Sequence, residues 1–179
     1  MGSVLDVPRL LSLKNIDDAI EIYYKLLKEI PLTIAASNLL ELLSKLKRGS
    51  IGKGPYPNVS IFEASNRIMT YLVILNGVKI LLNGYIKDLP FLEYRVEFGN
   101  ENHFAHDIMA QHGKTKLIGE AFNVSESFFQ LKKSKMLKKL RTNANDDEYM
   151  LIMFNKDAIP LSYVPKKSKN EIYLPVSLV

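Results

Sequence analysis

The chain has 179 residues, of which 47% are apolar, so its length and composition fit one globular domain with a sizeable core. It contains no cysteine, which excludes a disulfide framework and a zinc site built on thiolates. The net charge of +5 suits a polyanionic partner without requiring one. The sequence shows neither a signal peptide nor an apolar stretch long enough to span a bilayer, so we expect a cytoplasmic protein with no membrane partner.

Residues 14–48 predict a pair of helices. Apolar residues recur at a helical period between residues 15 and 29, and Pro31 ends this first helix. A second helix is predicted over residues 32–47, with leucines on one face and a basic last turn before Gly49. We expect this helical pair to complete the core of the domain. Its leucine content also makes it the expected extra surface of a homodimer.

A glycine- and proline-rich loop and a third helix come next. The loop, residues 49–58, carries Lys53, which is a candidate for phosphate contacts, although a plain connector is the simpler interpretation. The helix is predicted from residue 59 to residue 75, with Glu63 on its polar side. The Asn-Gly pair at 76–77 favours a stop there, and the apolar residues beyond it allow a short continuation.

Three strands follow, and in the first of them apolar and polar residues alternate. Their predicted ranges are residues 93–98, 103–111 and 116–124, and a hairpin turn at 99–102 joins the first two. Asp107 lies in the second of these strands and Glu120 in the third. Two carboxylates on adjacent strands are costly to bring together without a positive partner, and a divalent metal ion would supply the charge.

Ser125 is the predicted N-cap of a fourth, lysine-rich helix that extends to residue 141. At 3.6 residues per turn, Lys133 falls near the middle of the apolar stripe of this helix. The other lysines lie off the stripe and are candidates for contacts with nucleic-acid phosphates: Lys132, Lys135, Lys138 and Lys139. Residues 149–154 are continuously apolar, which is typical of a strand buried on both faces. The tail, residues 156–179, contains a short edge strand near 172–174.

The order of these elements resembles the PD-(D/E)XK nuclease superfamily. The resemblance covers residues 59–155: a helix with an acid (Glu63), a three-strand meander, His106-Asp107 in its second strand and Gly119-Glu120-Ala121-Phe122 in its third, then a helix and a buried strand. It implies an α/β fold with a restriction-endonuclease-like mixed β-sheet flanked by helices. Residues 14–48 would be an N-terminal helical extension of this nuclease-like core, and residues 156–179 a C-terminal tail.

The resemblance also implies a function. Asp107 and Glu120 would bind Mg²⁺, with Mn²⁺ as a substitute and Glu63 as a further ligand. The protein would then be a hydrolase of the type II restriction endonuclease kind, which binds double-stranded DNA and cuts its phosphodiester bonds. Cutting both strands needs two such sites, so a homodimer is expected. A repair or junction-resolving nuclease would share this chemistry.

The sequence departs from the family at Phe122, where the family usually has a catalytic lysine. One explanation is that the following helix supplies the positive group, with Lys133 as the first candidate and Lys132 as the second. The other explanation is a catalytically inactive protein that only binds nucleic acid or another partner. A zinc site is not expected, because His103 and His106 point to opposite faces of the predicted strand and His112 lies in a turn.

Overall fold

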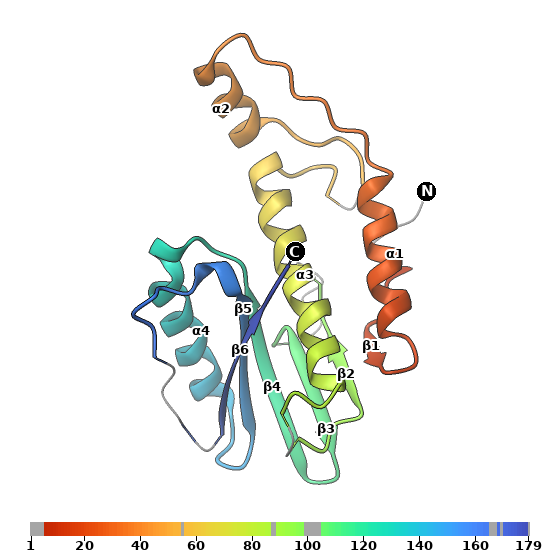
Figure 1. Ribbon diagram of the computed structural model, residues 1–179, viewed down its shortest axis with the longest axis vertical. Coiled ribbons are helices and arrows are strands. Elements are labelled where there is room, and N and C mark those ends of the chain that lie inside the picture. The colour runs from red at the N-terminus through yellow and green to blue at the C-terminus, as the bar shows by residue number, and fades with distance from the viewer. Residues whose placement is uncertain are drawn as a thin grey trace.

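The computed structural model shows an α/β fold in which helices pack on one six-stranded mixed sheet (Figure 1). The structure describes residues 6–54, 56–86, 89–98, 105–164, 168 and 170–178. The strands lie side by side in chain order: β1 (Leu10–Ser12), β2 (Glu93–Val96), β3 (Ile108–His112), β4 (Thr115–Phe122), β5 (Tyr149–Asn155) and β6 (Glu171–Val176). The predicted mixed sheet flanked by helices is confirmed.

The strands from β1 to β4 pair antiparallel, whereas β5 and β6 are parallel to β4. Gly113, with a positive φ of 59°, allows the tight turn between β3 and β4. A parallel pair needs a longer crossover, and α4 (Phe129–Asn143) supplies it between β4 and β5. The predicted meander, helix and buried strand therefore occur in the expected order.

Helices cover both faces of the sheet (Figure 1). Helices α1 (Ile16–Lys28) and α3 (Ile61–Leu82) pack on one face, and α4 packs on the other over β4 and β5. Strand β5 alternates between two apolar cores: Leu151 and Met153 face α3, whereas Ile152 and Phe154 face α4. The prediction of a strand buried on both faces is confirmed.

Helix α3 continues past the predicted stop at residues 76–77 to Leu82. Gly77 is buried, and a Cβ at this position would collide with Met153 Sδ and touch Val176. Glycine is therefore present here because α3 approaches β5 and β6 closely, and the buried contact outweighs its low helix propensity of about 1 kcal/mol relative to alanine.

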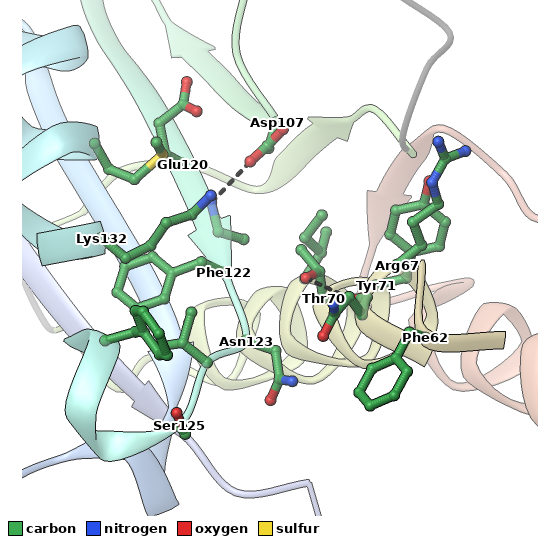
Figure 2. Close-up of a pocket in the computed structure, with 16 residues that line it drawn as sticks. Phe62, Arg67, Thr70, Tyr71, Asp107, Glu120, Phe122, Asn123, Ser125 and Lys132 are labelled. Atoms are coloured by element: carbon green, nitrogen blue, oxygen red, sulfur yellow. Dashed lines mark hydrogen bonds between the residues drawn. The ribbon is translucent and has the colours of Figure 1, made fainter. Parts of the chain in front are cut away.

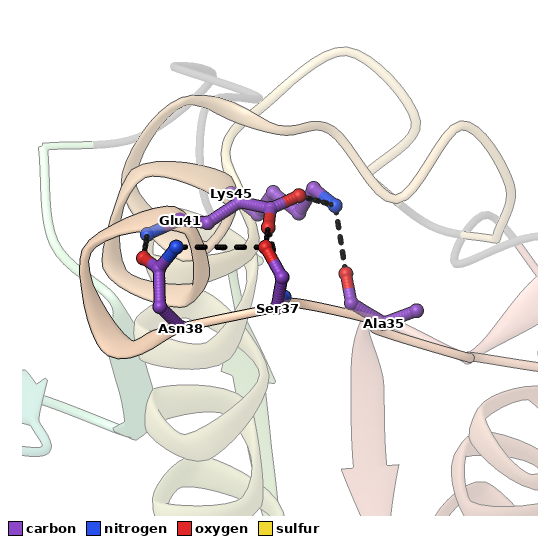
Figure 3. Close-up of polar contacts among 5 residues, drawn as sticks. All are labelled: Ala35, Ser37, Asn38, Glu41 and Lys45. Carbon is purple, nitrogen blue, oxygen red and sulfur yellow. Dashed lines mark hydrogen bonds and ion pairs between the residues drawn. The ribbon is translucent and has the colours of Figure 1, made fainter.

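Helix α2 (Leu39–Arg48) is held by its caps rather than by burial, since none of its residues is buried. The Asn38 side chain accepts from Glu41 N at 2.9 Å, and the Glu41 carboxylate accepts from Ser37 N at 2.8 Å, which resembles a capping box (Figure 3). Lys45 Nζ donates to Ala35 O at 2.7 Å. Hydrogen bonds from Lys45 and Ser37 lower the pKa of Glu41 to about 2.

Two predictions for the N-terminal helical pair are wrong. The second helix begins at Leu39 rather than residue 32, because the cap at Asn38 fixes its start. Only α1 adds to the core, through residues that include Ile16 and Tyr23. Helix α2 lies beyond the N-terminal end of α3, away from the sheet (Figure 1).

Other boundaries differ by a few residues. Strand β1 was not predicted, because three residues carry no recognisable period. Strand β3 begins only at Ile108, and residues 105–107 form a bend before it. The predicted turn at 99–102 and His103 lie outside the described residues. The predicted edge strand in the tail is confirmed as β6. Among the helices that the structure describes, none is long and apolar enough to cross a membrane.

Candidate active site

The two acids singled out in the sequence lie opposite each other on neighbouring strands. The last registered pair between β3 and β4 joins Ile108 and Gly119, so Asp107, one residue earlier, falls opposite Glu120. Asp107 itself lies in the bend just before β3, and it lines the same pocket as Glu120. Directly opposed residues of an antiparallel pair have Cβ atoms about 5 Å apart. The structure thus brings together the two predicted metal ligands.

A third carboxylate, Glu97, continues this row and was not selected from the sequence. Glu97 directly follows β2, and its backbone N donates to Asp107 O at 2.9 Å. This hydrogen bond places the two residues beside each other. The Glu97 side chain is buried. In the sequence, Glu97 is only one of the polar residues that alternate along the first predicted strand. The strand register that brings it beside Asp107 is not fixed by this local pattern.

Asp107 and Glu120 line a pocket of about 780 Å³ between α3 and the segment that leads into α4 (Figure 2). One wall comes from α3 and the other from the end of β4, η2 (Glu126–Phe128) and α4. The polar side chains that line the pocket besides the two acids are Asn66, Arg67, Thr70, Tyr71, Asn123, Ser125 and Lys132. The pocket therefore combines a pair of carboxylates with cations and amides.

Glu120 is buried, with 3% of its surface exposed, and two positive or polar partners hold it. Its Oε1 atom lies 2.8 Å from His106 Nδ1 and 2.7 Å from Lys139 Nζ. Strict alternation along the predicted strand would turn His106 to the face opposite Asp107, but residues 105–107 form a bend, and His106 contacts Glu120. Lys139, a predicted phosphate contact, is 40% exposed and makes an ion pair with the buried Glu120.

Asp107 is partly buried, and its Oδ2 atom accepts from Ala121 N at 2.9 Å (Figure 2). Burial, and then the neighbouring charge of Glu120, raise the pKa of Asp107 from 3.8 to about 6. Without a bound cation, the ionised form of Asp107 is therefore less stable in the folded protein than in water. Such raised pKa values are common for groups in functional sites.

The raised pKa gives a testable prediction for Asp107→Asn. Because the folded pKa is the higher one, folded protein keeps the proton between about pH 4 and 6 while unfolded chain releases it, so the free energy of unfolding falls across this window. The variant should escape this loss and be more stable than the parent by about 1–3 kcal/mol at pH 8, with no gain below pH 4. Denaturant unfolding at both pH values measures the difference.

The exposed Asp147→Asn change is the control for this experiment and should alter stability by less than about 0.5 kcal/mol at either pH. A gain in Asp107→Asn that is equal at pH 4 and pH 8 would contradict the raised pKa.

The two lysines that the sequence offered as replacements for the family lysine take different positions. Lys132 lines the pocket with the two acids. Lys133, the first candidate, packs toward the sheet as predicted but lies away from the acids, with Nζ 4.3 Å from the ring centroid of Tyr163 and 5.7 Å from that of Tyr173. The preference for Lys133 over Lys132 is therefore corrected by their positions.

Phe122 is buried in the core beneath α4, where its ring stacks on Phe154 at 5.7 Å between centroids and lies 6.1 Å from Phe129. A lysine at this position would bury its charge among aromatic rings, which is costly. The surroundings of residue 122 therefore suit an aromatic side chain and not a charged one.

The remaining predicted site residues lie apart from the acids. Glu63 is half-exposed and pairs with Arg67, and it is not among the residues that line the pocket. Its predicted role as a third metal ligand is not supported by this position. Lys53, Lys135 and Lys138 are exposed, as expected for residues that contact phosphates or only solvent. His112 is exposed at the end of β3.

The chemistry of Asp107 and Glu120 fits a hard divalent cation, which prefers one or two carboxylates and completes its shell with water and phosphate oxygens. The described residues engage Oδ2 of Asp107 and Oε1 of Glu120, and the second oxygen of each carboxylate remains for a cation. Within the described part of the chain, no group of three or more acids or histidines is placed to hold one metal ion. Water and substrate would therefore supply most of the ligands.

No family model matches this chain, and no curated protein and no solved structure shows significant similarity to it.

Proposed function

We propose that this protein is a divalent-metal-dependent nuclease that hydrolyses DNA phosphodiester bonds in the pocket of Asp107 and Glu120. The observation that carries the proposal is the pairing of these two carboxylates across β3 and β4 in a pocket that Lys132 also lines. Two carboxylates would repel a phosphodiester unless a cation lies between them and the substrate. The same cation would offset the cost of ionising Asp107.

The arrangement of the elements around the pocket supports the resemblance to the PD-(D/E)XK superfamily. Helix α3, the antiparallel strands β2 to β4, helix α4 and the parallel strand β5 follow the order of elements expected for that family. Both acids line one pocket together with residues of α3 and α4. We also propose membership in the family and a homodimer. Cutting of double-stranded DNA, as by a restriction endonuclease, is the alternative that cleavage of strand and duplex substrates tests.

In the proposed reaction, Asp107 and Glu120 would hold Mg²⁺, and this ion would supply a more acidic water and neutralise charge on the phosphate. His106 and Lys139 fix the Glu120 carboxylate through Oε1, and Lys139 offsets its negative charge. Lys132 faces the same pocket and stabilises the negative charge that develops on the phosphate in the transition state. Lys132 thereby takes the place that the family gives to a lysine at the position of Phe122.

A catalytically inactive nucleic-acid-binding protein is the rival function. Two observations favour it: an aromatic residue occupies the family lysine position, and Lys139 already neutralises Glu120 in the absence of a metal. Such a protein would bind polynucleotide at the same pocket without cutting it.

Cleavage assays with Mg²⁺, Mn²⁺ or EDTA separate the two functions. We expect both metals to support cutting of mixed-sequence plasmid and single-stranded DNA, and EDTA to abolish it, because the carboxylates alone cannot supply the nucleophile. Calorimetry with Mn²⁺ should show binding that the Asp107→Asn change weakens by about tenfold or more. An absence of both metal-dependent cutting and Mn²⁺ binding would refute the nuclease proposal.

A further inference from the structure

Two exposed phenylalanines line the pocket from opposite sides. Phe62 lies in the first turn of α3 with 48% of its surface exposed, and Phe128 ends η2 with 60% exposed. Figure 2 shows Phe62 on one side of the pocket and Ser125, at the entry to η2, on the other. Single exposed apolar residues are common on protein surfaces. Two aromatic rings that flank one polar pocket instead offer flat surfaces to a planar ligand.

One cation lies beside the Phe62 ring, and two more line the pocket. Lys47 Nζ, at the end of α2, is 6.0 Å from the centroid of the Phe62 ring, and Arg67 and Lys132 line the pocket itself. Asn66 and Asn123 add amide groups that both donate and accept hydrogen bonds. Positive charge, aromatic faces and amides together match the phosphate, ring and polar edge of a nucleotide.

The burial of Glu120 at the bottom of the pocket favours a single nucleic-acid strand over a duplex as the ligand. Glu120 is almost fully buried, and the pocket has a volume typical of a site for a small ligand rather than of a long groove. A duplex carries its phosphates on the outside of a wide cylinder with its bases stacked inside, so its bases cannot reach Phe62 or Phe128. A single strand presents unstacked bases that can.

We propose that this pocket binds an unpaired nucleotide whose base stacks on Phe62 or Phe128, so that the substrate is a single-stranded or frayed polynucleotide. This inference rests on the proposed nuclease function for the placement of the phosphate at Asp107 and Glu120. Stacking tolerates any base, and we therefore expect little sequence preference.

Fluorescence anisotropy with Ca²⁺ in place of Mg²⁺ tests binding without cleavage, because Ca²⁺ is also a hard cation with oxygen ligands but differs in size and geometry. The probes are labelled oligothymidine, its blunt duplex with oligoadenine, and oligouridine. We expect the single DNA strand to bind about tenfold more tightly than the duplex, and Phe62→Ala and Phe128→Ala each to weaken single-strand binding by about 5- to 100-fold. Tight binding of oligouridine alone would retain the unpaired base as the ligand and assign the substrate to RNA.

Leu131→Ala is the matched control, because Leu131 is an exposed apolar residue of α4 that does not line the pocket. It should leave binding unchanged, and circular dichroism should show all three variants folded. Phe62→Leu and Phe128→Leu keep apolar area but lose the ring, so they should bind as weakly as the alanine variants. Equal affinity for strand and duplex, or phenylalanine variants that bind like Leu131→Ala, would overturn the inference.

Cleavage of the same probes with Mg²⁺ distinguishes failure of this inference from failure of the nuclease function. Metal-dependent cutting of the duplex at a rate that the phenylalanine variants do not change would overturn the inference and keep the nuclease. Loss of single-strand binding in those variants, with no cutting by any metal, would keep the binding site and overturn the nuclease.

Discussion

Replacing Glu120 with Gln should lower the turnover of metal-dependent cleavage by about a thousandfold or more. The change keeps the volume of the side chain and its ability to contact His106 and Lys139. It removes one of the two negative charges that would hold the metal, and the amide then leaves the Lys139 charge uncompensated next to the phosphate site. Single-turnover cleavage at saturating Mg²⁺, beside Mn²⁺ calorimetry, measures the loss of chemistry and of metal affinity separately.

The chain offers a close control in Glu171→Gln. Glu171 begins β6, its side chain is as buried as that of Glu120, and it too pairs with a basic residue of α4, Arg141, at 2.6 Å. Both changes remove a buried carboxylate that faces a cation of the same helix, so both should cost similar stability. Only Glu120→Gln should affect turnover, and Glu171→Gln should retain it within about threefold. Equal loss of activity in both variants would trace the effect to stability and remove the support for a metal site at Glu120.

The sheet could be predicted from the sequence because its local patterns agree with its tertiary position. Alternation of period two in β2 reflects one buried and one exposed face, and the apolar run of β5 reflects burial on both faces. The acids at 107 and 120 were found because the predicted strand order placed them on neighbouring strands, although Asp107 lies in the bend just before β3.

Features that depend on contacts between distant segments could not be predicted. Gly77 looked like a helix stop because its close packing against Met153 is visible only in the folded protein. The contact between His106 and Glu120 was not predicted, because residues 105–107 form a bend before β3 and bends do not follow the alternation of a strand. Glu97 required the strand register to be counted across residues 99–104, which the local pattern does not fix.

The sequence also could not show which of Lys132 and Lys133 in α4 lies near the acids. At 100° per residue, Lys132 shares one flank of the helix with Met136 and Lys139, whereas Lys133 lies nearer the flank of Leu137. Lys133 lies within the apolar stripe and Lys132 lies beside it, and the sequence alone does not fix which side of the stripe faces β4. The structure shows that the flank of Lys132 faces the acids and that the flank of Lys133 faces the aromatic rings of Tyr163 and Tyr173.

We therefore expect Lys132→Ala to lower turnover by about a hundredfold or more, because it removes the positive charge that would stabilise the transition state. Lys133→Ala should lower stability through the lost contacts with the rings but keep turnover of the folded protein within about threefold. Single-turnover rates, normalised to the folded fraction from thermal unfolding, separate the two effects. If Lys133→Ala lost the chemistry and Lys132→Ala kept it, the lysine on the aromatic flank would have to reach the acids during the reaction, and the assignment made from this structure would be wrong.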